Sequence, residues 1–389
     1  MTDKSKQEKC IYRDTRIAIG NGWNINDIDT YTAIDRIGLL IPERDLHIDH
    51  SKNCLQRKSY QFGNDSYIGN SNGIFVKRMP RNFASLNFTL SFSLSRMLNG
   101  INLSSHTPVD YNRLTSEINE RLAEGGLCVK DWDRVQLCML EVNRNLILKD
   151  EYADYRSLLS VFKYPRAKRR YYKNSVYFQT PRNTIKTIIY DKGEEIRKRM
   201  RQSPIKTILR FEIKYTKTKL LSEHFERYVS YYNALPDQDR KPYLKYLSNF
   251  DVDVYFTDKV KQFLKPLDRF VNFPRPLTLE MGLHEHYWKN RYTEKCVKVA
   301  LEILKAYRSG LVIQYLNQNS ERIIKPSNRS ETSITRNKEI QRKADEILRD
   351  VIIIEEITNH GFRRIDELKK GLLEERPNSN FVKTPNRVA

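Results

Sequence analysis

The sequence lacks the features that would assign it to several common classes. No uncharged apolar stretch reaches the ~18–20 residues that a membrane-spanning helix needs, and the opening MTDKSKQEKC has no apolar core of a signal peptide. We therefore expect a cytoplasmic protein of a bacterial host cell, without a membrane partner. The five cysteines form no CxxC pair, which disfavours a disulfide framework and a zinc site. There is no Walker loop and no GxSxG elbow.

What the sequence does contain is an excess of positive charge. Sixty-nine Lys and Arg residues stand against 48 Asp and Glu residues, which gives a formal net charge of +21. Hydrophobic residues make up 39% of the chain and aromatic residues 11%, as in a folded soluble protein. A surplus of this size indicates a polyphosphate partner, and nucleic acid is the first candidate.

Hydrophobic periodicity predicts strands in the first part of the chain and helices in the last part. Residues 86–94 alternate strictly and predict a half-buried strand. A helix is predicted to begin at 107–110, with Thr107 as its cap and Pro108 in its first turn, and to end at Gly125. Further strands are predicted at 135–146, 184–190 and 207–215, and helices at 191–202, 293–316 and 336–354.

The positive charge is concentrated in one segment. Seventeen basic and four acidic residues lie between Pro165 and Lys219, so these 55 residues carry +13 of the total charge. Tyrosines are interleaved with the cations, an arrangement that suits single-stranded nucleic acid, whose bases stack while its phosphates are neutralised. A solvated basic surface is the alternative. The residues predicted to contact DNA are Arg166, Lys168, Arg169, Arg170, Lys173, Arg182, Lys186 and Arg210.

Within this segment the sequence IIYDKGEE places a tyrosine before a lysine and a carboxylate. Tyr190, Lys192 and Glu195 can act together, because a phenol can attack a phosphodiester and keep its energy in a phosphotyrosine bond. The phenol needs a nearby base or cation, and the transition state needs positive charge. The alternative is a tyrosine buried in a β-sheet.

Three glutamates fall on predicted strands or at a strand end. Glu141, Glu195 and Glu212 could converge on one sheet face, and carboxylates prefer hard Mg²⁺ or Mn²⁺. Structural ion pairs with Arg210 or Lys192 are the alternative.

Other candidate sites are weaker. The pairs His47/His50 and His284/His286 have ligand-like spacing but not the His-hydrophobic-His form of many nicking enzymes. Asp251 and Asp253, in FDVDVYF, would share one face of a strand, either as an acid pair or as an exposed polar edge.

The order of these features along the chain resembles the filamentous-phage rolling-circle replication initiators, the gene-two protein family, and more distantly the plasmid initiators. The resemblance runs from Ile41 to Tyr215. It rests on the segments IPERDLHIDH, SNGIFVKRM, LNFTLSFSLSRMLNGIN, LCMLEVNRN, IIYDKGEE and LRFEIKY.

By position, the resemblance implies that Tyr190 is the nucleophile and that Lys192 assists it. It also implies acidic roles for Glu195 and Glu212, while Glu141 falls where the family tends to have an aspartate. The implied fold is α+β, an antiparallel-sheet nicking domain with helices on one side, followed by a mainly helical C-terminal domain. The expected division is 1–35 as an N-terminal extension with a possible first strand, 36–233 as the nicking domain, 234–375 as the helical domain and 376–389 as a disordered tail.

The resemblance implies a site-specific endonuclease that nicks and rejoins one DNA strand through a 5′-phosphotyrosine, with Mg²⁺ or Mn²⁺ as cofactor. Its partners would be a replication origin, supercoiled duplex and single-stranded DNA. A host helicase and a host polymerase are further candidate partners. The alternative is a non-enzymatic basic DNA-binding or regulatory protein. A tyrosine recombinase is a third class, but it would need an Arg/His-rich pocket in place of the acids.

Overall fold

The structure is a computed structural model of the 389-residue chain. It describes residues 30–52, 54–58, 66–78, 87–99, 110–200, 206–289, 301–306, 309 and 333–374. The predicted tail at 376–389 and most of the predicted helix at 293–316 lie outside these residues, although 301–306 are helical.

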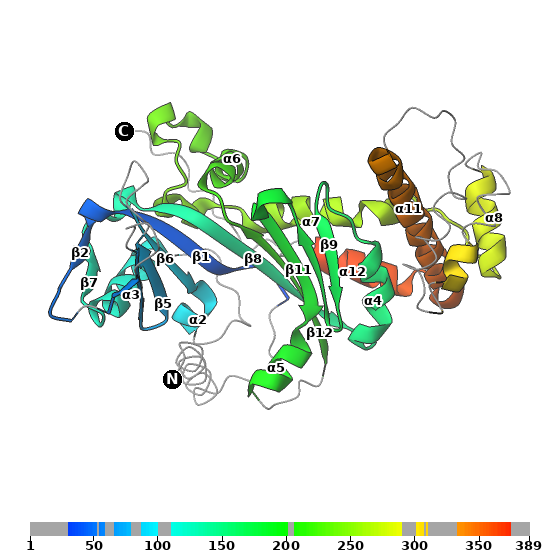
Figure 1. Ribbon diagram of the computed structural model, residues 1–389, viewed down its shortest axis with the longest axis horizontal. Helices are drawn as coiled ribbons and strands as arrows, with labels where there is room; N and C mark the ends of the chain where they lie inside the picture. The colour runs from blue at the N-terminus through cyan, green and yellow to red at the C-terminus, as the bar shows by residue number, and fades with distance from the viewer. Residues whose placement is uncertain are drawn as a thin grey trace, which may run out of the picture. The chain divides into compact units, whose positions relative to one another are not determined.

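A ten-stranded antiparallel sheet is the main feature (Figure 1), in the order β3-β4-β5-β6-β1-β8-β12-β11-β10-β9. Its strands are β1 Ala33–Pro42, β3 Gln56–Lys58, β4 Ser66–Ser71, β5 Ile74–Arg78, β6 Asn87–Ser93, β8 Gln136–Leu148, β9 Lys168–Tyr172, β10 Ser175–Gln179, β11 Ile185–Asp191 and β12 Thr207–Tyr215. Strands β2 Leu46–Ile48 and β7 Leu127–Val129 pair separately. The predicted α+β class and the four predicted strands, which correspond to β6, β8, β11 and β12, are confirmed.

Successive side chains of a strand point to opposite faces of the sheet, and the two faces lie in different surroundings. In β6, Phe88, Leu90 and Phe92 are buried, while the residues between them are half-buried. In β12, the face that carries Phe211 and Ile213 is also buried, and the Phe211 ring packs edge-on against Phe256 at 5.7 Å. This apolar packing fixes the register of the sheet, because a slip by one residue would turn every side chain to the other face.

The antiparallel register aligns residues in rows across five strands, β9-β10-β11-β12-β8. Directly paired residues of an antiparallel sheet point to the same side. The rows are Tyr172, Ser175, Tyr190, Arg210 and Asn145; Arg170, Tyr177, Ile188, Glu212 and Asn143; and Lys168, Gln179, Lys186, Lys214 and Glu141. We call the side that carries these fifteen residues the polar face.

Strand β1 contributes to the same region through a β-bulge. Ile34 pairs with Val142 and Arg36 pairs with Glu141, so Asp35 is an extra residue between two adjacent pairs. A bulge of this kind re-aims a side chain. Asp35 is buried and accepts a hydrogen bond from Ser93 Oγ at 3.0 Å.

The helices are α2 Leu94–Asn99, α3 Tyr111–Ala123, α4 Tyr152–Val161, α5 Lys192–Met200, α6 Thr218–Tyr228, α7 Val252–Asp268, α8 Leu279–Lys289, α11 Ser333–His360 and α12 Arg363–Leu373. Short 3₁₀ helices lie at Glu43–Asp45, Trp132–Arg134, Pro181–Asn183, Tyr232–Ala234, Asp237–Asp239 and Leu244–Asn249. The predicted helices at 191–202 and 336–354 are confirmed as α5 and α11.

Helix α3 begins later than predicted. Its cap is Asp110, whose side chain accepts from the Arg113 backbone N–H at 3.1 Å, whereas Thr107 lies outside the described residues. Asp is a stronger capping residue than Thr, which accounts for a start at Asp110 and not at the predicted Thr107. The predicted stop is confirmed, because α3 ends at Ala123 and Gly126 adopts a positive φ of 72°.

The predicted strand around Asp251 and Asp253 is wrong, because this segment begins helix α7. Asp251 Oδ1 accepts from the Val254 backbone N–H at 3.0 Å, as a helix cap does. Asp253 forms an ion pair with buried Arg144 at 3.1 Å. The alternation in FDVDVYF ends after a few residues, and buried side chains then continue at helical spacing through Leu267.

The chain forms two compact units that are discontinuous in sequence. The described residues up to Lys149, Pro165–Val260 and the end from Gly371 form the first unit, which contains the sheet. Asp150–Tyr164 and Lys261–Lys370 form the second. The sequence predicted contiguous domains with boundaries at residues 36, 234 and 376, whereas each of the two units combines separate stretches of the chain.

Ion pairs connect the helices within the second unit. Arg363 and Arg364 both bond to Asp150, and Arg364 also lies 3.5 Å from Glu356. His286 is buried on α8, with its Nε2 at 3.2 Å from Asp350, while its neighbour His284 is exposed. Among the described residues no helix is long and apolar enough to cross a membrane.

Candidate active site

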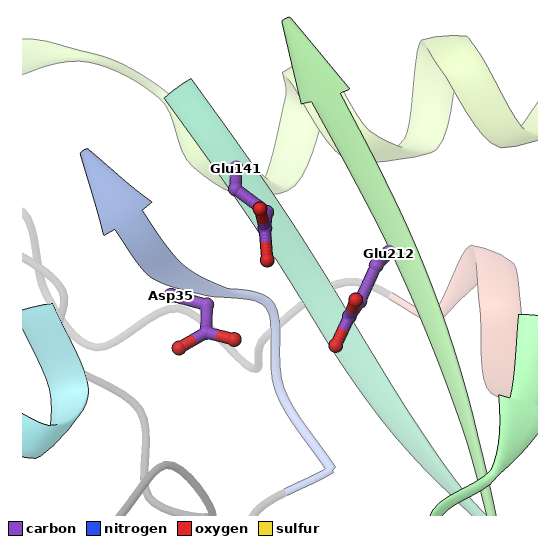
Figure 2. Close-up of side chains that lie close together, drawn as sticks. All are labelled: Asp35, Glu141 and Glu212. Carbon is purple, nitrogen blue, oxygen red and sulfur yellow. The ribbon is translucent and has the colours of Figure 1, made fainter. Parts of the chain in front are cut away.

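Three carboxylates from three adjacent strands meet on the sheet. Asp35 of β1, Glu141 of β8 and Glu212 of β12 each place a carboxylate oxygen within 4.8 Å of the others. Figure 2 shows the three side chains directed toward one space. Asp35 and Glu212 are buried and Glu141 is partly exposed. Repulsion among three carboxylates in such a place needs compensating positive charge.

Basic side chains supply part of this charge. Arg210 is fully buried, with Nη1 at 3.8 Å from both Asp35 Oδ2 and Glu212 Oε1. Its Nε donates to Asn145 Oδ1 at 2.7 Å. A second basic residue, Lys214, places its Nζ 3.1 Å from Glu141 Oε2. The acids therefore form ion pairs with basic residues, as the alternative interpretation of the sequence predicted.

Tyr190 is directed at the acid cluster. Its hydroxyl donates a hydrogen bond to Glu212 Oε1 at 2.7 Å, and its side chain is partly exposed. It pairs with Arg210 in the sheet register, which sets the phenol beside the buried guanidinium. The tyrosine predicted as nucleophile and two of the three predicted acids, Glu141 and Glu212, therefore lie close together.

Lys192 and Glu195 form a pair next to Tyr190. Helix α5 begins at Lys192, directly after β11, and one helical turn brings the Glu195 carboxylate to 2.7 Å from Lys192 Nζ. Lys192 is only 2% exposed, and its Nζ lies 5.7 Å from the centre of the Tyr190 ring. Glu195 thus holds an ammonium group beside the phenol.

Burial and mutual charge shift the pKa values of these groups. Burial, and then the charge of Glu141, raise the pKa of Glu212 to about 7. Burial, and then the charge of Arg210, lower the pKa of Lys192 to about 8, against the opposing effect of Glu195. Burial raises the pKa of Tyr190 well above its usual value, and Arg210 acts in the opposite direction. Added positive charge near the phenol would therefore favour its ionised form.

The acid cluster differs from the predicted trio in one member. Glu195 pairs with Lys192, and Asp35 stands as the third carboxylate beside Glu141 and Glu212. Asp35 was not among the acids predicted from the sequence. The available signal was a pair of polar residues, Asp35-Arg36, inside the otherwise apolar segment AIDRIGLLI, which is where a bulge occurs.

The residues predicted to contact DNA occupy different surroundings. Arg166, Lys168, Arg170, Lys173 and Arg182 are exposed, and Arg169 and Lys186 are partly exposed. Arg210 differs from all of these, because its side chain is 0% exposed and lies inside the acid cluster. Its charge acts on the carboxylates and the phenol and does not contribute to an exposed binding surface.

Comparison with known proteins gives limited similarity. No family model matches the chain, and no curated protein matches it in sequence. A solved structure that is similar to this chain is a rolling-circle replication initiator protein from Geobacillus stearothermophilus. The identity is 12%, the match covers 56% of this chain and 94% of that chain, and the TM-score is 0.28.

Proposed function

We propose that this chain nicks and rejoins one strand of DNA through a covalent bond to Tyr190. The observation that carries the proposal is the 2.7 Å hydrogen bond from the Tyr190 hydroxyl to Glu212, because Glu212 also belongs to the three-carboxylate cluster. A nucleophile and an acid cluster on one sheet face, with two buried cations beside them, meet the needs of attack on a phosphodiester.

The acid cluster fits a divalent metal ion. Asp35, Glu141 and Glu212 offer only oxygen ligands, and hard ions such as Mg²⁺ or Mn²⁺ prefer these. The burial of Asp35 and Glu212 makes their negative charge costly unless a cation neutralises it. When bound, the ion would supply positive charge to the scissile phosphate.

The remaining steps belong to side chains of this chain. Glu212 orients the Tyr190 hydroxyl and accepts its proton, and the Tyr190 oxygen then attacks the phosphorus. The new bond joins the Tyr190 oxygen to phosphorus. The bond from phosphorus to the 3′ oxygen breaks, and this oxygen takes up a proton to become a free 3′-OH. The 5′ side of the nick stays on the protein as a phosphotyrosine.

Two buried cations beside the phenol have different roles in this proposal, and Lys192 is the one that would stabilise the charge developing on the phosphate. Lys192 stands beside the Tyr190 ring, and Glu195 holds it there. Arg210 neutralises the buried acids and favours the ionised phenol. In this proposal Lys192 is catalytic, whereas Glu195 and Arg210 are positioning residues.

The biological role that best fits this chemistry is initiation of rolling-circle replication. The phosphotyrosine keeps the energy of the broken bond, so a later 3′-OH can reverse the reaction and close a displaced circle. The free 3′-OH would prime a host polymerase. We place this activity in the cytoplasm of a bacterial host, with the replication origin, supercoiled duplex and single-stranded DNA as partners.

The test is formation of a covalent adduct. We would incubate the full chain with 3′-labelled single-stranded oligonucleotides of randomised sequence, with Mg²⁺, with Mn²⁺ or with EDTA, and resolve the products on a denaturing gel. The proposal expects a labelled protein band that requires the metal, and a nucleotide mapped to Tyr190 by mass spectrometry. DNA binding that persists in every condition without any adduct would favour the non-enzymatic DNA-binding protein.

A further inference from the structure

The basic segment is divided between the two faces of the sheet. Strand β9, at the edge of the ten-stranded sheet, carries Lys168, Arg170 and Tyr172 on the polar face, and Arg169 and Tyr171 on the opposite face. The pairing of β10 with β9 and β11 adds Tyr177 to the polar face. Four of the six cations and tyrosines on these two strands therefore share a face with Tyr190, and Arg169 and Tyr171 do not.

The two tyrosines that the β9–β10 hairpin places on the polar face, Tyr172 and Tyr177, are open to solvent. Tyr172 is 51% exposed and Tyr177 is 36% exposed, although large aromatic side chains are usually buried. Their ring centroids lie 5.0 Å apart in an edge-on arrangement, and this contact restricts both rings. The exposed cations Lys168 and Arg170 lie on β9, the strand that also carries Tyr172, and on the same face. The result is a fixed aromatic pair with positive charge around it.

This surface lies in register with the proposed nucleophile. Tyr172 is in the same cross-strand row as Tyr190, with Ser175 between them. Neighbouring strands are about 4.8 Å apart, so two strand spacings separate the two tyrosines by about 10 Å. A DNA strand with its phosphate at Tyr190 would place a base only a few nucleotides away on Tyr172 or Tyr177.

The chemistry of the surface selects unpaired bases. An exposed aromatic ring can stack on a base whose face is free, and such stacking tolerates any sequence. In a duplex the base faces are covered by their neighbours, and only phosphates and groove edges remain for contact. Cations alone would bind the phosphates of a duplex and of a single strand alike. The aromatic pair adds affinity only for the single strand.

We propose that Tyr172 and Tyr177 stack unpaired bases next to the scissile phosphate and thereby determine specificity for single-stranded over duplex DNA. The position of the scissile phosphate rests on the proposed function of Tyr190. Tyr171 provides an internal control, since it is 46% exposed on the same strand but points to the opposite face, where Arg169 lies 5.0 Å from its ring.

The test measures binding without catalysis. We would titrate fluorescein-labelled oligo(dT), and a labelled duplex of mixed sequence, with the full chain in EDTA and follow anisotropy. The Tyr172→Leu/Tyr177→Leu variant should bind the single strand about tenfold or more weakly and the duplex within about twofold of wild type. Tyr171→Leu should match wild type on both probes. The Tyr172→Phe/Tyr177→Phe variant should bind the single strand as tightly as wild type, because both rings remain.

Three results would overturn the proposal: unchanged single-strand binding in the double variant, an equal loss on the duplex, or an equal loss in Tyr171→Leu. Tyr172→Leu alone, at the exposed edge strand, serves if the double variant does not fold by circular dichroism, and its loss should fall on the single strand only. A loss of binding that is confined to single strands would support the stacking surface whether or not Tyr190 forms an adduct. Failure of the adduct alone would therefore count against the proposed function and not against the stacking surface.

Discussion

The Tyr190 hydroxyl and the Glu212 carboxylate are joined by a 2.7 Å hydrogen bond, although 22 positions separate them in the sequence. The register of β11 and β12 produces this contact, since Tyr190 pairs with Arg210 and Glu212 pairs with Ile188 on the same face. One pairing thus sets a nucleophile, a buried cation and a carboxylate side by side. The nicking proposal depends on this relationship.

Replacing the phenol hydroxyl should separate chemistry from binding. We expect Tyr190→Phe to abolish the covalent adduct and nicking while DNA affinity stays within about twofold, because phosphate contacts dominate nucleic-acid binding. Gel detection of the adduct and anisotropy measure the two effects. Tyr171→Phe, on the opposite face, is the control and should retain the adduct. An adduct that persists in Tyr190→Phe would move the nucleophile to another tyrosine.

The metal site should respond to the acid cluster and not to Glu195. Wild-type protein should gain about 2.7 kcal/mol of unfolding free energy at a metal concentration 100 times the dissociation constant. Asp35→Asn, Glu141→Gln and Glu212→Gln should each reduce the gain, as followed by denaturant unfolding with and without Mn²⁺. Glu195→Gln should keep it, because Glu195 bonds to Lys192. A gain that is lost in Glu195→Gln but kept in Asp35→Asn would instead support Glu141, Glu195 and Glu212, the ligand set predicted from the sequence.

Local patterns predicted much of the sheet. Strand β12 has the predicted bounds Thr207–Tyr215, and β6 and β11 lie within one residue of their predictions, because alternation of polar and apolar residues is typical of an extended strand. The segment around Asp251 misled the prediction, since a short window cannot distinguish a brief alternation from the first turn of a helix such as α7.

The third carboxylate depended on non-local geometry. Asp35 joins the cluster through a bulge in β1 and through the pairing of β1 with β8, more than 100 positions along the chain. The polar pair Asp35-Arg36 is a local signal for the bulge, but no pattern within one segment indicates that β1 pairs with β8. The split of the basic hairpin between two faces likewise follows from the β9–β10 pairing, whereas the composition of residues 165–219 only indicated that charge and aromatic residues occur together.

The salt dependence of DNA binding should follow the face on which a cation lies. Neutralising Lys168 and Arg170 together to Gln should reduce the log–log salt slope on single strands by about 1.4, because each phosphate that the protein neutralises contributes about 0.7 to that slope. Arg169→Gln, on the opposite face, should leave the slope unchanged. Affinities measured between low and moderate salt give the slopes, and equal slopes for the double variant and wild type would remove the polar face from the binding surface.

Acid should destabilise the protein through His224, which is buried on α6 among the rings of Tyr215, Tyr228 and Tyr255. Burial, and then the charge of Lys259, lower the pKa of His224 to about 3. The unfolded chain takes up a proton near pH 6.5 and the folded chain does not, so the full stability is present above pH 6.5 and falls by up to about 1.4 kcal/mol per unit as the pH drops toward 3.

His224→Phe keeps a ring in this space and should flatten the decline between pH 6.5 and 5, as measured by urea unfolding. Tyr255→Phe changes the same cluster but keeps the histidine, so its pH slope should equal that of wild type. The same slope in His224→Phe and wild type would assign the acid sensitivity to other groups.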